Sequence, residues 1–204
     1  MKICIIGSGY VGLVSGACFS DLGNTVTCVD INREIIEKLN KGIIPIYEPG
    51  LQELVVRNLK KKRLLFTTDI SSSIKKSDII FICVGTPTKN NKADLKYVFN
   101  VTKSIKSNLN RYKIIVTKST VPVTTGDKIT KILKSNKNKN KFDVVSNPEF
   151  LREGEAIRDF QFPDRVVVGT NSNKASKIMK KLYLPLIKKG GRYFHTSRRS
   201  AELI

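Results

Sequence analysis

The stretch KICIIGSGYVG, residues 2–12, decides the fold of this chain. Its apolar run ends at Gly7, and Gly7, Gly9 and Gly12 then follow in the spacing G-x-G-x-x-G. Residues 10–22 carry apolar side chains at helical spacing, so the pattern predicts a strand, a tight turn and a helix in direct succession. This succession is typical of the phosphate-binding turn of a dinucleotide-binding fold.

Each residue of the turn has a physical task in such a fold. Gly7 permits the tight turn, Gly9 lets the backbone approach a pyrophosphate, and Gly12 lets helix and strand pack closely. The start of the helix directs N–H groups and a partial positive charge at the phosphates. The predicted cofactor contacts in this turn are Gly7, Gly9, Tyr10, Val11 and Gly12.

Asp30 ends the next apolar run, TVTCVD, and lies about 20 residues beyond the glycine turn. A carboxylate there accepts hydrogen bonds from the adenosine ribose and repels a 2′-phosphate, which favours NAD over NADP. The nearby cation Arg33 leaves NADP open. A flavin site and a purely structural turn are also compatible with the glycine spacing.

Continuous rather than alternating apolar runs recur along the rest of the chain. Such runs indicate strands buried on both faces, as in a parallel sheet covered by helices. We therefore predict an α/β, Rossmann-like, doubly wound and mostly parallel sheet with helices on both faces. The expected strands lie within 2–7, 25–30, 63–69, 77–85, 111–120, 141–150, 165–170 and 192–196. The expected helices lie within 10–22, 32–42, 69–76, 95–108, 124–134 and 173–182, with one more ending at Lys60.

The chain is strongly basic, with 37 Lys and Arg against 17 Asp and Glu, a formal net charge of +20. The basic residues gather in runs such as 60–63 and 134–141 without interleaved aromatic residues that could stack on bases. We therefore expect no nucleic-acid partner and interpret the charge as a general attraction for anionic ligands. A basic nucleic-acid binder is the alternative.

The four cysteines, Cys4, Cys18, Cys28 and Cys83, lie inside apolar runs and form no CxxC pair. This placement predicts buried, reduced thiols and no metal site, rather than disulfides or metal ligands. His195 ends a short strand-like run, which favours a structural over a catalytic role. The first apolar run is too short for a signal peptide or a membrane span, so we expect a cytoplasmic protein without a membrane partner.

Four further motifs make the prediction narrower. They are YEPGL (47–51), VGTPT (84–88), KSTVPV (118–123) and SNPEFLREGEAIRDFQFPDRVVVG (146–169). With these motifs the chain resembles the NAD-binding domain of the UDP-glucose/GDP-mannose dehydrogenase family from residue 1 to 204, and NPEFLREG is the most specific of the matching strings. The members most similar to it are those that oxidise UDP-glucose.

The resemblance implies an activity. Members of the family oxidise a sugar C6 alcohol to the acid in two hydride transfers to NAD, through a thiohemiacetal and a thioester on a cysteine. For UDP-glucose, the reaction consumes two NAD and water and yields UDP-glucuronate and two NADH. A GDP-mannose or UDP-N-acetyl-sugar substrate is the alternative within the family.

The resemblance also implies roles for individual residues. Thr86 and Thr120 would lie beside the nicotinamide end of NAD. Glu149 resembles a glutamate assigned to proton transfer or to activation of the hydrolytic water, and Glu153 resembles one that contacts both NAD and substrate. The implied catalytic residues are Thr120, Glu149 and Glu153, and the implied substrate contacts are Glu149, Phe150, Leu151, Arg152 and Glu153, with Phe150 and Leu151 contributing mainly backbone.

Physical reasoning about the strand ends points to the same region. The ends at 7–12, 84–88, 117–120 and 147–153 should converge at the carboxyl edge of the sheet, where doubly wound folds bind ligands. If a helix begins there, Glu149 and Glu153 share a face, and their repulsion raises the pKa of one of them. Alternatively, Glu153 caps a helix or pairs with Arg152 or Arg158.

One position departs from the family pattern. Many members carry a basic residue five positions after the ribose-binding acid, and this chain has Ile35 there. Arg33 could replace that cation, or the affinity for the cofactor is weaker.

The last residues, TSRRSAELI at 196–204, indicate the first turns of an amphipathic helix capped by Thr196 or Ser197. The resemblance implies that the nucleophilic cysteine and the dimer interface lie in a C-terminal half. We therefore expect a single NAD-binding domain over 1–204, with a dinucleotide-binding core over about 1–125, an extension over about 126–196 and the start of a connecting helix at 197–204. The whole protein is then expected to be a homodimer, and these residues alone should not turn over substrate. A stand-alone NAD-binding module is the alternative.

Overall fold

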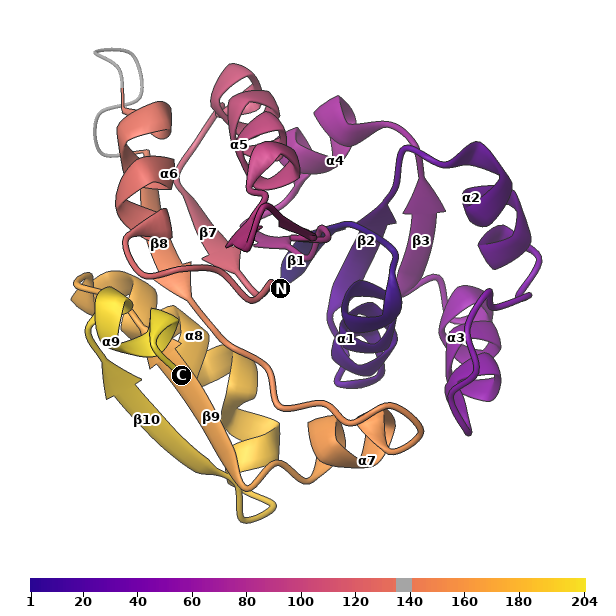
Figure 1. The fold of residues 1–204 in the computed structure, drawn as a ribbon. Helices are drawn as coiled ribbons and strands as arrows, with labels where there is room; N and C mark the ends of the chain where they lie inside the picture. Colours follow the sequence, from indigo (N-terminus) through magenta and orange to yellow (C-terminus); the bar gives the residue numbers. More distant parts are fainter. Residues whose placement is uncertain (135–140) are drawn as a thin grey trace.

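A computed structural model describes residues 1–134 and 141–204, and the central part of the basic run 134–141 lies outside the described residues. One eight-stranded sheet runs through the molecule in the order β10-β9-β8-β7-β4-β1-β2-β3 (Figure 1). The strands are β1 (Lys2–Ile6), β2 (Thr25–Val29), β3 (Leu64–Thr67), β4 (Ile79–Ile82), β7 (Lys113–Thr117), β8 (Phe142–Ser146), β9 (Arg165–Gly169) and β10 (Arg192–Thr196).

The strand order confirms the predicted doubly wound sheet. The chain begins near the middle of the sheet, builds β2 and β3 on one side, and then returns to build β4, β7 and β8 on the other. The neighbouring strands pair in parallel except β8 and β9, which meet in antiparallel fashion at Ser146 and Gly169. The reversal between β1 and β4 is the point at which such sheets bind ligands.

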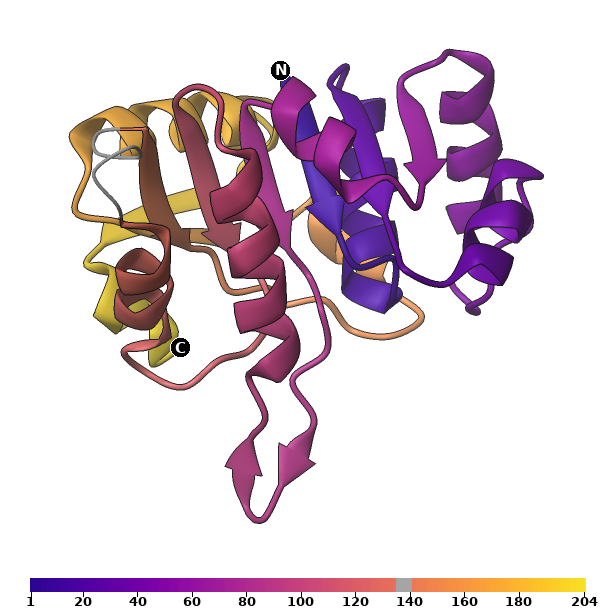
Figure 2. The same ribbon diagram turned by 90° about the horizontal axis from the view of Figure 1, so that it is seen from above.

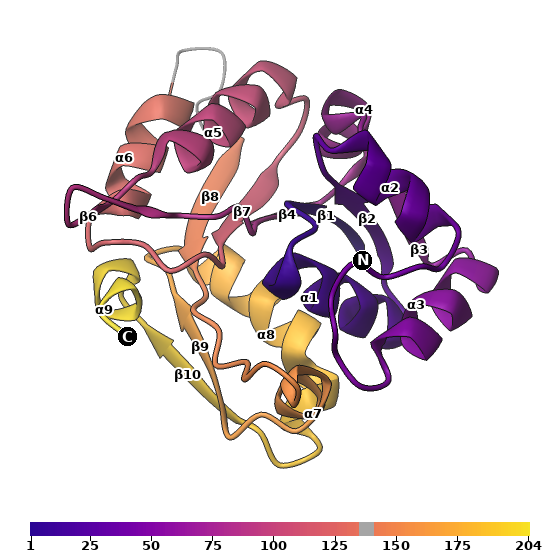
Figure 3. The same cartoon turned by 45° about the vertical axis from the view of Figure 1, so that its right-hand side comes forward.

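Helices cover both faces of the sheet, as Figures 1 and 3 show. One face carries α1 (Tyr10–Asp21), α3 (Leu51–Lys60), α7 (Ala156–Gln161) and α8 (Asn173–Ile187), and the other carries α4 (Ile70–Lys76), α5 (Lys96–Asn108) and α6 (Thr125–Leu133). The remaining helices are α2 (Arg33–Asn40), which contacts β3, and α9 (Arg198–Glu202), which contacts α6, β8 and β9. Ile3 and Ile5 face the first layer, whereas Cys4 and Ile6 face the second, which explains the continuous apolar runs.

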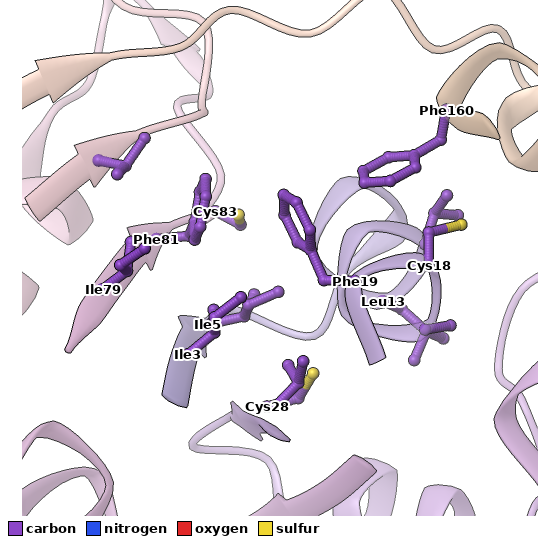
Figure 4. Packing of buried hydrophobic residues seen from close by; sticks show 14 of the residues in the cluster. Ile3, Ile5, Leu13, Cys18, Phe19, Cys28, Ile79, Phe81, Cys83 and Phe160 are labelled. Atoms are coloured by element: carbon purple, nitrogen blue, oxygen red, sulfur yellow. The ribbon is translucent and has the colours of Figure 1, made fainter. Parts of the chain in front are cut away.

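Helix α1 is the most deeply buried helix on its face, because every residue from Gly12 to Ser20 is buried. Phe19 packs edge-on against Phe160 at 5.0 Å between ring centroids and lies 5.1 Å from the ring of Phe81 (Figure 4). A Cβ at Gly16 would lie 2.4 Å from the sulfur of Cys28, so helix and strand touch here. This packing holds α1, which begins at the glycine turn, against the sheet.

The four cysteines are free and buried, as expected from their apolar surroundings. Burial raises the pKa of Cys4 and of Cys83 to about 12, and it also raises the pKa of Cys18 and Cys28. Among the described residues, no group of three or more metal-ligating side chains is gathered as a metal would need. The described helices also include none with both the length and the apolar character that crossing a membrane requires.

Several elements differ from the sequence predictions, and α7 is a helix that they did not include. A short hairpin of β5 (Thr88–Lys89) and β6 (Lys92–Ala93) projects from the body of the molecule (Figure 2). It turns through Asn90 and Asn91, both of which have positive φ angles. Helix α8, predicted over 173–182, continues to Ile187, because the buried Tyr183 and Leu186 extend its apolar face past the exposed Pro185.

Candidate functional site

The carboxyl ends of β1, β4, β7 and β8 lie along one edge of the sheet, and the loops that follow them are side by side (Figure 3). The hydroxyl of Thr86 donates to the carbonyl oxygen of Thr120 at 2.9 Å, and the hydroxyl of Ser119 donates to that of Val84 at 2.6 Å. The structure thus brings Thr86 and Thr120 together, as the expected convergence of strand ends requires.

The glycine turn has the geometry that its spacing predicts. Gly7 has a φ of +103°, and a Cβ there would lie 2.6 Å from the carbonyl oxygen of Cys83. A Cβ at Gly12 would lie 1.9 Å from the carbonyl oxygen of Gly7, so the helix can approach the turn only without a side chain. At Gly9, by contrast, no atom of the described residues other than Gly9 and its two chain neighbours lies within 4 Å of the Cβ position. Gly7 and Gly12 therefore serve the packing, and Gly9 leaves open space.

This open space lies at the N-terminus of α1, which no side chain within 1–134 or 141–204 caps. The first turn contains no acidic residue that would neutralise the partial positive charge of the helix end. Uncapped N–H groups at the end of a twelve-residue helix are suited to a diphosphate.

Asp30 lies beside the same turn and is half-buried. One oxygen of its carboxylate accepts the N–H of Ser8 at 2.7 Å, and the other accepts the N–H of Asn32 at 3.0 Å. Each carboxylate oxygen keeps acceptor capacity for a ribose hydroxyl. Arg33 is exposed at the start of α2, whereas Ile35 packs on the core. The residues of this region therefore fit NAD.

The segment 147–155 follows β8 and lines the next part of the edge. Asn147 is buried and holds it in place: its backbone N–H donates to the carbonyl of Thr117 at 2.9 Å, and its side-chain amide donates to that of Val167 at 2.8 Å. The hydroxyl of Tyr183 donates to the side-chain oxygen of Asn147 at 2.5 Å. These bonds fix the point at which the segment leaves the sheet.

The condition that a helix places Glu149 and Glu153 on one face is not met in this described segment: the next helix, α7, begins only at Ala156. Gly154 has a φ of +85°, outside the helical region, so the backbone cannot run as one helix from Glu149 into α7. Instead, the carboxylate of Glu149 accepts the N–H of Leu151 at 2.6 Å.

The two arginines considered as partners of Glu153 bind other acids. Arg152 lies 2.7 Å from the carboxylate of Asp159, and Arg158 lies 3.5 Å from that of Glu155. Asp159 thereby holds the pKa of Arg152 above its usual value. These contacts brace the segment against α7 and do not involve Glu153.

A cleft of about 780 Å³ opens beside this segment. Its walls include Lys118, Asn147, Glu149, Phe150, Arg165 and Tyr183. The guanidinium of Arg165 lies 4.4 Å from the centre of the Phe150 ring. Burial lowers the pKa of Lys118, although the nearby Cys83 and Glu149 oppose that effect. The lining as a whole holds four cations and four carboxylates together with aromatic rings, so the cleft is suited to a polar ligand that both donates and accepts hydrogen bonds.

Sequence reasoning missed Glu48, which links the glycine turn to the segment 147–155. It is buried, and its carboxylate accepts the hydroxyl of Tyr10, the N–H of Gly154 at 2.9 Å and the N–H of Ile157 at 3.3 Å. Burial together with the bond to Glu48 raises the pKa of Tyr10 to about 12, so this hydroxyl remains a donor at neutral pH. The motif YEPGL contains Glu48, but the local pattern gives no sign of such distant partners.

The comparisons with known proteins agree with this geometry. Residues 1–187 match the model of the UDP-glucose/GDP-mannose dehydrogenase family, NAD binding domain. The chain is 52% identical over 210 residues to the UDP-glucose 6-dehydrogenase TuaD of Bacillus subtilis, covering 100% of this chain and 44% of that one. It is 48% identical to the UDP-glucose 6-dehydrogenase of Rhizobium meliloti, covering 100% and 48%.

Solved structures give the same picture. A UDP-glucose dehydrogenase from Pyrobaculum islandicum superposes with a TM-score of 0.93 at 36% identity, over 98% of this chain and 47% of that one. A GDP-mannose dehydrogenase from Pseudomonas aeruginosa has a TM-score of 0.92 at 33% identity, over 100% and 48%. The chain spans about half the length of the curated relatives it matches.

Proposed function

Because this chain belongs to the UDP-glucose/GDP-mannose dehydrogenase family and contains its NAD-binding domain, we propose that it is the cofactor half of a UDP-glucose 6-dehydrogenase. One observation carries the proposal. The glycine turn, which fits NAD, and the segment 147–155, which lines a cleft with polar and charged walls, lie at the same edge of the sheet and are joined through Glu48.

On the cofactor side, bound NAD supplies the hydride acceptor. The N–H groups at the start of α1 bind its pyrophosphate, with Gly9 leaving the space, and Asp30 accepts hydrogen bonds from its adenosine ribose. Thr86 and Thr120, whose contact fixes both loops, flank the nicotinamide end. Glu153 contacts NAD and the sugar nucleotide where the two meet.

On the substrate side, the segment from Glu149 to Glu153 lines the sugar nucleotide. Glu149 holds or moves a proton at the sugar C6 oxygen or at the hydrolytic water, and it lies close enough to the buried Lys118 to influence that amine. Phe150 and Leu151 contribute mainly backbone. Arg152, oriented by Asp159, offers its remaining N–H groups to the ligand.

Oxidation of an alcohol to an acid by two NAD needs a nucleophile that holds the aldehyde between the two hydride transfers. The four cysteines of this chain are buried, and their thiol pKa values are raised, so none is available as a thiolate. We infer that the nucleophilic cysteine is supplied from outside these 204 residues. Residues 1–204 alone then bind NAD without oxidising UDP-glucose.

A chimera tests this function. Residues 1–204 are joined to the part of the Bacillus subtilis relative that they do not match, and NADH is followed by its absorbance. We expect two NADH for each UDP-glucose from the chimera and none from residues 1–204 alone. A chimera that binds NAD and leaves UDP-glucose unoxidised would contradict the proposal.

One variant of the chimera and two competing substrates extend the experiment. Glu149→Gln in the chimera should lower kcat by about a hundredfold or more while NAD still binds, because the variant lacks the group that moves the proton. GDP-mannose and UDP-N-acetylglucosamine serve as competing substrates. Faster turnover of either would assign the chain to another branch of the family.

A further inference from the structure

Helix α6 follows the loop that contains Thr120, and it begins without a side-chain cap of its own. Its first flanking residue, Thr124, has a left-handed φ of +76°, and its side chain caps nothing within the described residues. Instead, the carboxylate of Glu202 in α9 accepts the N–H groups of Thr124 and Gly126, each at 2.7 Å. A carboxylate that accepts two N–H groups at a helix start satisfies orphan donors and complements the positive end of the helix.

Glu202 reaches this position because α9 packs very closely against α6 and β9. A Cβ at Gly126 would lie 2.4 Å from the Cδ of Arg198, and a Cβ at Gly169 would lie 2.4 Å from the Cβ of Ala201. Ala201 is buried. Two glycines on separate elements therefore allow α9 to approach closely enough for Glu202 to cap α6.

Two arginines of α9 also hold it against α6. Arg198 forms an ion pair with Asp127 of α6, and the Nε of Arg199 donates to the other oxygen of Asp127 at 2.9 Å. Arg198 also donates to the hydroxyl of Thr130 at 3.2 Å. Because the arginines hold the start of α9 and Ala201 packs on Gly169 near its end, the carboxylate of Glu202 has a defined position relative to the loop before α6.

That loop, residues 118–124, leads from the end of β7 to the capped N–H of Thr124. At its other end, the N–H of Lys118 donates to the carbonyl of Ile82 at 3.0 Å, and between the two the carbonyl of Thr120 accepts the hydroxyl of Thr86. At the α6 end of the loop, the hydroxyl of Thr125 also donates to the carbonyl of Pro122 at 2.6 Å. Loss of the Glu202 cap would leave the N–H groups of Thr124 and Gly126 without their acceptor and would loosen this end of the loop.

We propose that Glu202 is a positioning residue for the cofactor: by capping α6 it fixes the loop 118–124 and so holds Thr120 and Thr86 at the nicotinamide end of NAD. Glu202 acts through this loop and does not touch the cofactor. The inference rests on the proposed placement of the nicotinamide beside these two threonines.

The test distinguishes binding of the nicotinamide end of the cofactor from binding of its adenosine end. Calorimetry measures the affinity of the chain for NAD and for ADP-ribose, which lacks nicotinamide, and the fluorescence of bound NADH reports the surroundings of the nicotinamide ring. For Glu202→Gln we expect NAD affinity to fall about tenfold and the NADH fluorescence enhancement to shrink, because hydrogen bonds to a charged group are lost. Its affinity for ADP-ribose should change by less than about twofold, because the glycine turn and Asp30 are untouched.

Two further variants serve as controls. Glu53→Gln removes an exposed carboxylate from the first turn of α3, far along the chain from this loop, and should leave all three readouts unchanged. Glu202→Asp keeps the charge and should restore part of the NAD affinity. Parallel loss of NAD and ADP-ribose binding, or no change in either, would overturn the inference alone. Wild-type protein that binds neither compound would overturn the proposed function as well.

Discussion

At the scale of single residues, Glu48 is the point where the two ligand regions meet. Its carboxylate is buried and accepts three donors, one from the glycine-turn helix and two from the segment that continues into α7. A buried carboxylate is costly unless it is hydrogen-bonded, so these partners offset its desolvation. The same bonds leave the glycine turn and the segment 147–155 little freedom to move independently.

Removal of one donor tests this link. Tyr10→Phe leaves the Glu48 carboxylate one hydrogen bond short, and we expect the free energy of unfolding to fall by about 1–3 kcal/mol. Urea denaturation measures the change. Tyr97→Phe, at an exposed tyrosine of α5, is the matched control and should change stability by less than about 0.5 kcal/mol. Equal effects of the two substitutions would show that the Glu48 link contributes nothing.

The glycine turn gives a second test at this scale. Gly9 has a φ of −71° and open space at its Cβ position, so we expect Gly9→Ala to leave the fold intact and to be neutral or slightly stabilising, by up to about 1 kcal/mol. Its methyl group would occupy the space assigned to the pyrophosphate, and NAD affinity should fall about tenfold or more. Thermal unfolding and calorimetry measure both. Undiminished NAD affinity would show that the pyrophosphate does not bind at this turn.

At the scale of elements, α9 is held to α6 by the pairing of Asp127 with Arg198 and Arg199. Hydrogen bonds from these arginines hold the pKa of Asp127 below its usual range. The folded protein therefore binds fewer protons here in acid than the unfolded chain. The contribution of this pairing is fully present above the usual Asp pKa of about 4 and is lost as the pH falls through the lower value of the folded state.

Asp127→Asn tests the pairing through its pH dependence. We expect a loss of about 1 kcal/mol or less at pH 7, since the carboxylate is partly exposed, and a smaller difference from the wild type as the pH falls below about 4. Chemical denaturation across this pH range measures both. A difference that stays constant or grows in acid would contradict the assignment.

The sequence predicted elements well where the signal is local. Continuous apolar runs marked the strands because both faces of the sheet are covered, and Ser197 caps α9 as one of the two expected residues. The segment after β8 was harder to predict, because its path depends on Asn147 bonding to strands far along the chain. The partners of Glu48 and Glu202 are likewise distant in sequence, up to 109 and 78 residues away, so local patterns carry no trace of them.

At the scale of the whole molecule, the order of the strands assembles the site. Strands β1, β4, β7 and β8 are separated along the chain, yet their carboxyl ends share one edge because these strands pair in parallel. The strand order reverses between β1 and β4, where such sheets bind ligands. Sequence motifs predicted which loops meet there, because each follows an apolar run. They did not predict the antiparallel junction of β8 with β9, since that pairing depends on the packing of the whole sheet.

Calorimetric titration of the chain with NAD and with NADP tests the central claim most directly. In the proposed placement of the cofactor, Asp30 faces the position of a 2′-phosphate, and its carboxylate is fixed by the N–H groups of Ser8 and Asn32. We expect NAD to bind at one site and NADP to bind at least about tenfold more weakly, because the carboxylate accepts ribose hydroxyls and repels the phosphate. Failure to bind NAD, or equal or tighter binding of NADP, would contradict the claim that this domain is built for NAD.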